Sequence, residues 1–201
     1  MSKMMGSNKS DVLDGDSGAD DIRGKKGDDV VNGNSGDDHL YGNAGNDQLH
    51  GGVGNDVEFG GRGNDHLWGD DGQDSLSGGA GSDTIEGGAG NDTLMGDGGA
   101  DTLTGGAGSD TFLFNAGDAD GSRDTITDFN PLEDQINLSS LAPVGGLLSV
   151  VDALTGQAGQ LALQVDLLHN HTVLLYDQNG DGQSDLTISV GGVVNLLDLI
   201  L

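Results

Sequence analysis

Cysteine is absent from the 201-residue sequence, proline occurs only twice, and aromatic residues make up 3% of it. Without cysteine the chain has neither disulfides nor thiol chemistry. No segment approaches the roughly 18 consecutive apolar residues that a membrane helix needs, so membrane insertion is not expected. Residues 1–10 contain no apolar run either, and we therefore expect no cleavable N-terminal secretory signal.

Basic residues are also scarce, since 7 Lys and Arg stand against 34 Asp and Glu, giving a formal net charge of −27. A surface this acidic repels nucleic acid and anionic membranes, and it leaves cations as the natural partners. Low hydrophobicity combined with high net charge usually predicts disorder. A more specific pattern is needed to displace that interpretation.

Glycine is abundant, with 39 residues, and it recurs with a period of nine. From Gly15 to Leu113 the chain divides into eleven nonapeptides without an insertion, and a degenerate unit precedes them at 6–14. All eleven have Gly at positions 1 and 4 and Asp at position 6, and ten have a large apolar residue at position 8. An internal repeat this regular predicts a solenoid. Disorder remains the expectation only for the metal-free chain.

Each repeated position has a physical role. Glycine permits a positive φ and a close approach of neighbouring turns, which leaves carbonyl oxygens free to face a cation. Asp at position 6 supplies the hard anionic oxygen that Ca²⁺ prefers. Positions 7 to 9 predict a three-residue strand in which position 8 points inward and positions 7 and 9 point to solvent. Two nonapeptides would then complete one coil of eighteen residues.

This pattern resembles the GGxGxDxUx repeat of the repeats-in-toxin (RTX) family, in which U is a large apolar residue. The resemblance implies an all-β fold, a right-handed parallel β-roll, with Ca²⁺ between turns two units apart. One turn would give the carbonyls of positions 2 and 4 and its Asp, and the next would give the carbonyls of positions 1 and 3 and its Asp. Asp83 and Asp101 would share one ion, and Asp92 and Asp110 another. The gaps in stacks of six and five turns imply about nine ions.

The resemblance therefore assigns metal ligands to the position-6 aspartates and to loop carbonyls. The aspartates are Asp20, Asp29, Asp38, Asp47, Asp56, Asp65, Asp74, Asp83, Asp92, Asp101 and Asp110. The carbonyls belong to Gly78, Gly79, Ala80, Gly81, Gly87, Gly88, Ala89, Gly90, Gly96, Asp97, Gly98, Gly99, Gly105 and Ala107.

Glu58 is the one exception to the apolar pattern at position 8, and it falls between Leu40 and Leu76 on the same sheet. A buried, unpaired carboxylate is costly and shifts towards its neutral form. We expect a locally twisted strand that turns Val57 or Phe59 inward instead. The alternative is a functional role for Glu58 itself.

The period ends after Leu113, and a different pattern of alternating apolar and polar residues follows. It predicts strands within 124–129, 134–141, 161–168, 172–176 and 185–190, and a short helix at 147–154. A β-rich, non-repeating segment of this kind would cap the open end of the roll. The expected organisation is a tail with a degenerate repeat at 1–14, a calcium-binding β-roll at 15–113, and a cap with a secretion signal at 114–201.

One loop between two of these strands has a second calcium-like pattern. Its oxygen-bearing side chains alternate along the loop around Gly180 and Gly182, and they belong to Asp177, Asn179, Asp181, Gln183 and Asp185. The pattern DxNxDGxxD predicts one further calcium ion, although Ile188 at position 12 excludes an EF-hand. A plain Asn-Gly hairpin turn is the alternative.

The C-terminal third resembles the secretion domain of serralysin-type metalloproteases and related type I secretion substrates. The matching segments are SDTFLF (109–114), DTITDF (124–129), DQINLSSL (134–141) and YDQNGDGQSDLTISV (176–190). The end, Asp198 followed by Leu199–Leu201, is similar to their acidic residue and terminal apolar triplet. The resemblance implies a bacterial, extracellular protein that a type I secretion transporter exports unfolded and that folds outside the cell.

Enzymatic activity is not predicted, because the zinc signature HExxH of serralysins and the hydrolase motif GxSxG are both missing from the sequence. The leading interpretation is a non-enzymatic calcium-binding module, either a small secreted protein or the tail of a secreted enzyme with a fused catalytic domain. The alternative is an extracellular adhesion or polysaccharide-binding roll that uses Tyr41, Phe59 and Trp68. The spacing places Tyr41 and Phe59 on one sheet and Trp68 on the other, so support for a sugar platform is weak.

Overall fold

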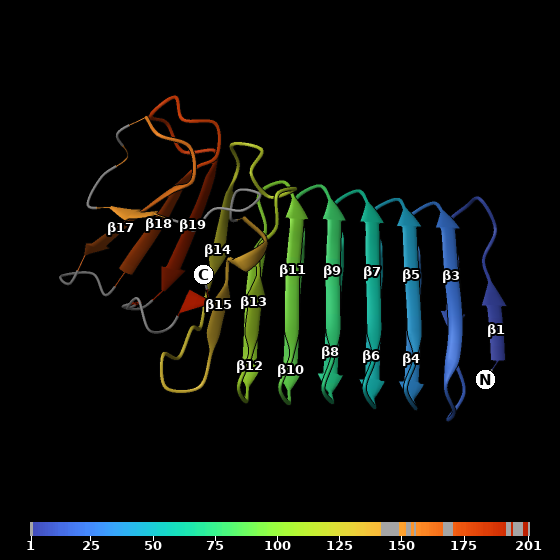
Figure 1. The fold of residues 1–201 in the computed structure, drawn as a ribbon. Helices are drawn as coiled ribbons and strands as arrows, with labels where there is room; N and C mark the ends of the chain where they lie inside the picture. Colours follow the sequence, from blue (N-terminus) through green and yellow to red (C-terminus); the bar gives the residue numbers. More distant parts are fainter. Residues whose placement is uncertain are drawn as a thin grey trace.

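The computed structural model of this chain describes residues 2–141, 149–151, 154, 156–166, 171–191, 194 and 199–200. These residues form strands and turns, together with one 3₁₀ turn at Ser139–Leu141 (η1). Figure 1 shows a ladder of strands that runs from the N-terminal end to a C-terminal cap. In the described ranges, no helix is long and apolar enough to cross a membrane. The prediction of an all-β protein is confirmed.

The strands belong to two sheets, and successive strands of the repeat region alternate between them. The first sheet contains, in spatial order, β1 (Ser2–Met5), β3 (Asp20–Lys26), β5 (His39–Ala44), β7 (Val57–Arg62), β9 (Ser75–Ala80), β11 (Thr93–Gly98), β13 (Thr111–Leu113), β15 (Gln135–Asn137) and β20 (Leu199–Ile200). The second contains β16 (Ser149–Val151), β17 (Gln160–Asp166), β18 (His171–Asp177), β19 (Leu186–Gly191), β14 (Arg123–Ile126), β12 (Thr102–Ala107), β10 (Thr84–Ala89), β8 (His66–Asp71), β6 (Gln48–Val53), β4 (Val30–Ser35) and β2 (Val12–Asp14).

Parallel pairing in the repeat region joins residues eighteen positions apart. Ile85, for example, lies opposite Leu67 on one side and Leu103 on the other. Two nonapeptides therefore complete one coil, and the predicted parallel β-roll is confirmed. The strands are longer than predicted, because β10 covers six residues and its Gly88 and Ala89 also pair with the next coil. The expectation of three-residue strands was wrong, since glycines at positions 1 and 2 allow a nearly continuous ladder and leave only positions 4 to 6 for the turn.

The core consists of the position-8 side chains, which form one buried column on each sheet. Side chains such as Leu94 and Ile85 are fully buried, whereas their neighbours at positions 7 and 9 are half-buried. The same apolar cluster continues through Ile126 and Ile136 into the cap, where it includes Tyr176. The cap thus closes the roll by sharing its core, as a solenoid end requires.

The cap extends both sheets before it changes direction. Strand β14 pairs with β12 and β15 pairs with β13, both in parallel, while β17, β18 and β19 form an antiparallel meander against β14. The predicted strand at 172–176 is confirmed over its whole range, and those at 124–129, 134–141 and 185–190 are confirmed over part of theirs. The strand predicted at 161–168 is confirmed for 161–166, and residues 167–168 lie outside the described part of the chain.

One element of the C-terminal region differs from its prediction. The sequence at 147–154 predicts a short helix, but Ser149–Val151 forms strand β16, parallel to β17. The β-branched pair Val150 and Val151 suits a strand position, and the open edge of β17 offers backbone partners. Residues 147–148 and 152–153 lie outside the described residues.

The first residues of the chain also join the roll. Strand β1 pairs in parallel with β3, and β2 pairs in parallel with β4. The segment at 1–14, expected as a tail with a degenerate repeat, therefore contributes a further coil before the first complete unit.

Position 2 of the repeat needs a left-handed backbone even where it is not glycine. Gly79 and Gly88 have φ of 104° and 109°, and the same position has φ of 89° at Lys25 and 62° at Asp97. A side chain in this region costs roughly 1–2 kcal/mol. Position 4 is less tolerant, because a methyl group at Gly90 would lie 1.4 Å from the carbonyl oxygen of Gly72.

We predict that Lys25→Gly stabilises the folded chain by about 1 kcal/mol, because it removes the strain of a side chain at positive φ. The measurement is the thermal or urea unfolding midpoint in millimolar calcium. Lys26→Gly is the matched control, since Lys26 is exposed and has no positive φ, and it should leave stability unchanged or lower it. An equal effect of the two substitutions would contradict the prediction.

Candidate metal centre

The aspartates at position 6 point into the roll and form one ladder in each stack of turns. Asp83 precedes Ile85 on the same strand face, because side chains two residues apart on a strand share a face. The backbone N–H of Asp65 donates to Oδ1 of Asp83 over 2.7 Å, and the N–H of Asp83 donates to Oδ1 of Asp101 over 2.8 Å. All eleven side chains are buried. Each carboxylate thus ties its own coil to the preceding coil.

The second oxygen of most of these carboxylates has no partner. Oδ2 is buried without a hydrogen-bond donor, in the described part of the chain, in Asp29, Asp38, Asp47, Asp56, Asp65, Asp74, Asp83, Asp92 and Asp101. An unpartnered buried carboxylate oxygen is costly, and native proteins rarely leave one without a partner. Nine such atoms in a regular series indicate a missing positive partner.

Each unpartnered Oδ2 lies over the first glycine of its own repeat. A methyl group added at Gly87 would be 2.6 Å from Oδ2 of Asp92 and 2.6 Å from the carbonyl oxygen of Gly105 in the next coil. The carbonyls of positions 2 and 4 enter the gap from the preceding coil: a methyl at Gly88 would lie 2.2 Å from the carbonyl oxygen of Asp70, and one at Gly99 would lie 1.7 Å from that of Gly81. Glycine therefore keeps open a space into which oxygens from two successive coils converge.

Carboxylate and carbonyl oxygens are the ligand set of Ca²⁺, and a site of this kind needs no hydrogen-bond donor. Within the described residues, no three His, Cys, Asp or Glu side chains gather into one potential metal site. The gaps instead combine few carboxylates with backbone carbonyls. The oxygens of the repeat region fit a calcium ion in each gap.

The electrostatics of the ladder are unfavourable for the carboxylates on their own. Burial, with the charges of Asp101 and Asp65 added to it, raises the pKa of Asp83 to about 7. Burial likewise raises the pKa of Asp74 to about 7 and that of Asp47 to about 6. In the first coil the pKa of Asp20 is lowered, mainly by hydrogen bonds from the backbone of Asp16 and Ser2. Away from that end, the backbone N–H groups lower the pKa of the aspartates less than burial raises it.

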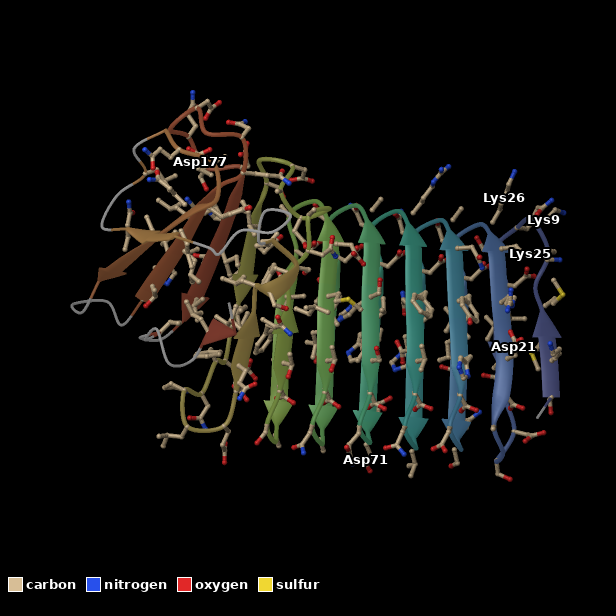
Figure 2. The ribbon with its side chains drawn as sticks, viewed as in Figure 1. Lys9, Asp21, Lys25, Lys26, Asp71 and Asp177 are labelled. Carbon is tan, nitrogen blue, oxygen red and sulfur yellow. The ribbon has the colours of Figure 1, made fainter. Side chains whose placement is uncertain are left out.

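Basic residues offer little compensation, because five of the seven lie within residues 1–26. Figure 2 shows Lys9, Lys25 and Lys26 at one edge of the N-terminal end, with Asp71 on the opposite edge and Asp177 in the cap. The described ion pairs of Lys and Arg both involve Asp21, with Lys3 and Arg23 as partners. The ladder beyond the first coils is therefore left without internal counter-charges.

The ladder extends beyond the repeats, which the sequence analysis missed. The backbone N–H of Asp101 donates to Oδ1 of Asp124, and that of Asp110 donates to Oδ1 of Asp134, each over 3.0 Å. Burial raises the pKa of Asp124 to about 8. The sequence does contain a sign of this extension, because Asp-Thr-Ile at 124–126 and Asp-Gln-Ile at 134–136 match positions 6 to 8 of the repeat, although the glycines are absent.

A second ladder at position 5 was also missed. On the exposed side of the turns, the N–H of Asn64 donates to Oδ1 of Asn46, and the N–H of Ser82 donates to Oδ1 of Asn64. This ladder runs opposite to the aspartate ladder, because each side chain here accepts from the following coil. The frequent Asn or Asp at position 5 was its signal.

The loop between β18 and β19 uses its carboxylates to fold its own backbone. Asp177 is fully buried and accepts the N–H groups of Gly180 and Gly182, while Asp185 accepts those of Gln178 and Asn179. The side chain of Asp181 accepts the N–H of Gln183 and is exposed. The predicted ligands therefore share one loop, but their side chains do not meet at one point.

The expectation that the strand twists at Glu58 and turns Val57 or Phe59 inward was wrong. The Cα of Glu58 pairs with Leu40 and Leu76, its side chain is fully buried, and Phe59 beside it is 40% exposed. Regular pairing on both sides holds β7 in register, so the backbone does not twist to expose the single buried carboxylate. Burial, followed by the charges of Asp56 and Asp74, raises the pKa of Glu58 well above its ordinary value.

Aromatic side chains on the outer faces of the two sheets stack along the roll. The rings of Tyr41 and Phe59 lie 5.3 Å apart and nearly parallel, and Arg23 covers the Tyr41 ring at 4.4 Å. On the other sheet, Trp68 stacks on His50 at 4.2 Å and on His66 at 3.5 Å. Ring faces that cover one another are not available to a sugar ring.

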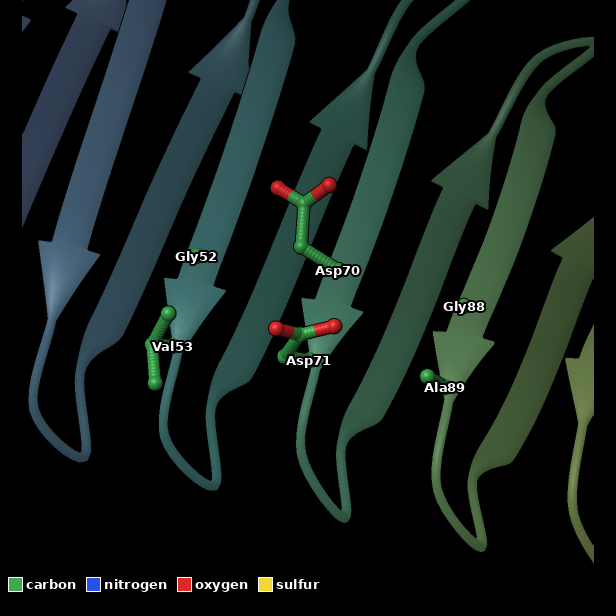
Figure 3. A pocket seen from close by; sticks show the side chains of 6 residues that line it. All are labelled: Gly52, Val53, Asp70, Asp71, Gly88 and Ala89. Carbon is green, nitrogen blue, oxygen red and sulfur yellow. The ribbon is translucent and has the colours of Figure 1, made fainter.

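A shallow groove lies on the second sheet. It has a volume of about 490 Å³ and is lined by Gly52, Val53, Asp70, Asp71, Gly88 and Ala89 from β6, β8 and β10 (Figure 3). It exists because Gly52 and Gly88 have no side chains beside Asp70. Both aspartates are exposed to water, unlike those of the ladder.

Comparison with known proteins places this architecture in a family. A family model described as the C-terminal domain of Peptidase M10 serralysins matches residues 15–201. No curated protein matches the chain.

The chain is also similar to solved structures. For the AlgE6R3 subunit of the Azotobacter vinelandii mannuronan C5-epimerase, the identity is 25% and the TM-score 0.36, covering 97% of this chain and 80% of that chain. For the AlgE6R2 subunit the values are 27% and 0.38, covering 85% and 89%. For the extracellular lipase LipA from Serratia marcescens they are 18% and 0.38, covering 99% of this chain and 40% of that one.

We predict that the metal-free chain becomes more stable as the pH falls from 8 to 5. Burial raises the folded-state pKa of Asp47, Asp83 and Asp124 to about 6, 7 and 8, above the 3.8 of an unfolded Asp, so the folded state binds more protons and gains stability as the pH decreases through this window. Far-UV circular dichroism of metal-stripped protein across this range measures the effect. A loss of strand signal on acidification to pH 5 would contradict it.

Proposed function

Because the chain belongs to the family of serralysin C-terminal domains, whose RTX β-rolls bind calcium, we propose that it is a non-enzymatic calcium-binding module that folds on binding Ca²⁺ after type I secretion. The observation that carries the proposal is the series of nine buried, unpartnered Oδ2 atoms, each facing a space that only glycine leaves open. About nine ions in the roll would partner them.

Residues from both coils that border a gap would contribute oxygen ligands to its ion. In the gap between Asp83 and Asp101, Asp83 would offer its Oδ2 together with the carbonyls of Gly79 and Gly81. The following coil would offer the carbonyls of Gly96 and Gly98 and Asp101. When bound, calcium supplies the positive charge that offsets the crowded carboxylates. The hydrogen bonds from each Asp N–H to the next Oδ1 hold these oxygens in place.

Metal binding and folding would be one event, because the ligands come together only when coils are stacked. A single buried side chain per nonapeptide is a thin core, and it cannot by itself order the glycine-rich chain. In a cytosol poor in calcium, the chain would stay unfolded and suit a type I transporter. In calcium-rich surroundings outside the cell it would fold, with 15–113 as the roll and 114–201 as the cap and secretion signal.

Two finer assignments belong to the same proposal. The loop from Asp177 to Asp185 would hold one additional ion, after its side chains exchange part of their backbone hydrogen bonds for the metal. The chain would serve either as a small secreted protein or as the tail of a larger enzyme. A polysaccharide-binding function is less well supported, because the faces of Tyr41 and Phe59 cover each other.

We predict that the wild-type chain is largely unstructured in chelator at neutral pH and gains strand structure cooperatively in millimolar Ca²⁺. The physical reason is the repulsion between ladder carboxylates, which divalent charge removes. Far-UV circular dichroism during a calcium titration measures it, with magnesium as the control ion, since Mg²⁺ demands a smaller and more regular site. A spectrum that is insensitive to chelator would overturn the proposal.

We predict that Asp83→Asn raises the calcium concentration needed for folding and removes at least one ion from the bound stoichiometry. The asparagine Oδ1 still accepts the N–H of Asp65, but an amide group replaces the anionic Oδ2. Calorimetric titration and circular dichroism measure the two effects.

The control for that substitution is Asp28→Asn, at position 5. Asp28 is exposed and its Oδ1 accepts the N–H of Asn46, so the amide preserves the outer ladder and removes one negative charge. This variant should bind as many ions as the wild type. Equal losses in both variants would show that net charge, and not the buried Oδ2, sets the stoichiometry.

A further inference from the structure

One gap of the roll differs from the others in the number of carboxylates that enter it. A methyl group added at Gly51 would lie 2.5 Å from Oδ2 of Asp56, 2.9 Å from Oε1 of Glu58 and 2.9 Å from the carbonyl oxygen of Gly69. At Gly33 and Gly87 the corresponding oxygens come only from the unit's own aspartate and the next coil's carbonyl. At Gly15 a third oxygen is also near, the backbone carbonyl oxygen of Asn32 at 3.2 Å, but among the described first-position glycines only Gly51 has oxygens of two different carboxylates among its nearest atoms.

Strand geometry explains why Glu58 reaches this gap. Glu58 is at the inward face of β7 and Asp56 immediately precedes that strand, two residues earlier, so their side chains lie on the same side of the backbone. Leucine at the same position would end in the core, as Leu40 and Leu76 do in the neighbouring strands. The longer, polar side chain of Glu58 instead brings a carboxylate to the unpartnered Oδ2 of Asp56.

The carboxylate of Glu58 has no other role in the described structure. Both of its oxygens are buried without a well-formed hydrogen bond, and the backbone N–H of Gly51 at the same gap is the one neighbouring group that stabilises its charge. The surrounding charges are those of Asp56, Asp70 and Asp74, all negative. A position of this kind is unfavourable for a carboxylate unless a cation shares it.

We propose that Glu58 is an additional cation ligand, which makes the gap between the coils of Asp56 and Asp74 a more negative and tighter site than the others. The inference rests on the proposed calcium-binding function and adds to it one site of different character. Affinity of oxygen-ligand sites rises with the number of charged ligands. This gap would therefore fill first, near the middle of the roll, and it would favour a trivalent lanthanide more strongly than its neighbours do.

The test is a calcium titration of the full-length chain by calorimetry, followed by terbium luminescence. The variants are Glu58→Gln, which keeps the shape and removes the charge, and Glu58→Leu, which restores the apolar pattern. The control is Glu86→Gln, because Glu86 is a partly exposed position-9 residue that contacts His66 on the surface. We expect the wild type and Glu86→Gln to show one class of site that binds about tenfold more tightly than the rest. Both Glu58 variants should lose that class.

The outcomes separate the two proposals. A wild-type chain that binds no calcium would overturn the proposed function, and with it this inference. Wild-type binding with one uniform class of sites, unchanged in Glu58→Gln, would overturn the role of Glu58 alone. If Glu58→Leu only increases stability in chelator while the number and affinity of sites stay unchanged, Glu58 is a destabilising core residue and not a ligand. Glu58→Gln carries the test if Glu58→Leu fails to fold.

Discussion

The constraint on which this structure depends is a carboxylate that the fold buries with only one of its oxygens satisfied. At each repeat, Oδ1 of the inward aspartate accepts a backbone N–H from the preceding coil, and at nine of the eleven repeats Oδ2 is buried without a hydrogen-bond donor. Stacking the coils repeats this conflict at every step, because identical residues lie directly above one another. A roll built from this repeat therefore has little positive charge of its own to offset these carboxylates, because its few basic residues lie mainly at its N-terminal end.

The same constraint explains the other regular features of the repeat. A side chain at position 1 or 4 would occupy the space between coils, so glycine is required there for steric reasons as well as for its backbone conformation. Position 8 fills the narrow interior, and the asparagine ladder at position 5 ties the turns on their outer side. The cap continues the ladders and the apolar core without the glycines. Asp124 and Asp134 extend the two aspartate ladders, and the apolar side chains of the roll pack against those of the cap.

Glu58 shows how far a local preference can be overruled. A buried carboxylate in an apolar column suggests that the strand twists to expose it, yet parallel pairing on both sides keeps the backbone in register. The helix expected at 147–154 fails for a related reason, because Ser149–Val151 pairs with the free edge of β17. In both places, partners distant in sequence outweigh the tendency of the local segment.

The sequence by itself determined the period, the columns of aspartates, the inward column of apolar residues and most strands of the cap, and its resemblance to the RTX family implied the all-β parallel roll. It could do so because an exact nine-residue repeat leaves one consistent stacking, in which each position meets its own copy. Only the tertiary structure decided that nine of the Oδ2 atoms lack a partner, that the ladders continue into 124–134, and that Glu58 lies beside Asp56 at Gly51. These facts depend on distances between coils and across the two sheets, and the spacing of residues along a chain does not set those distances.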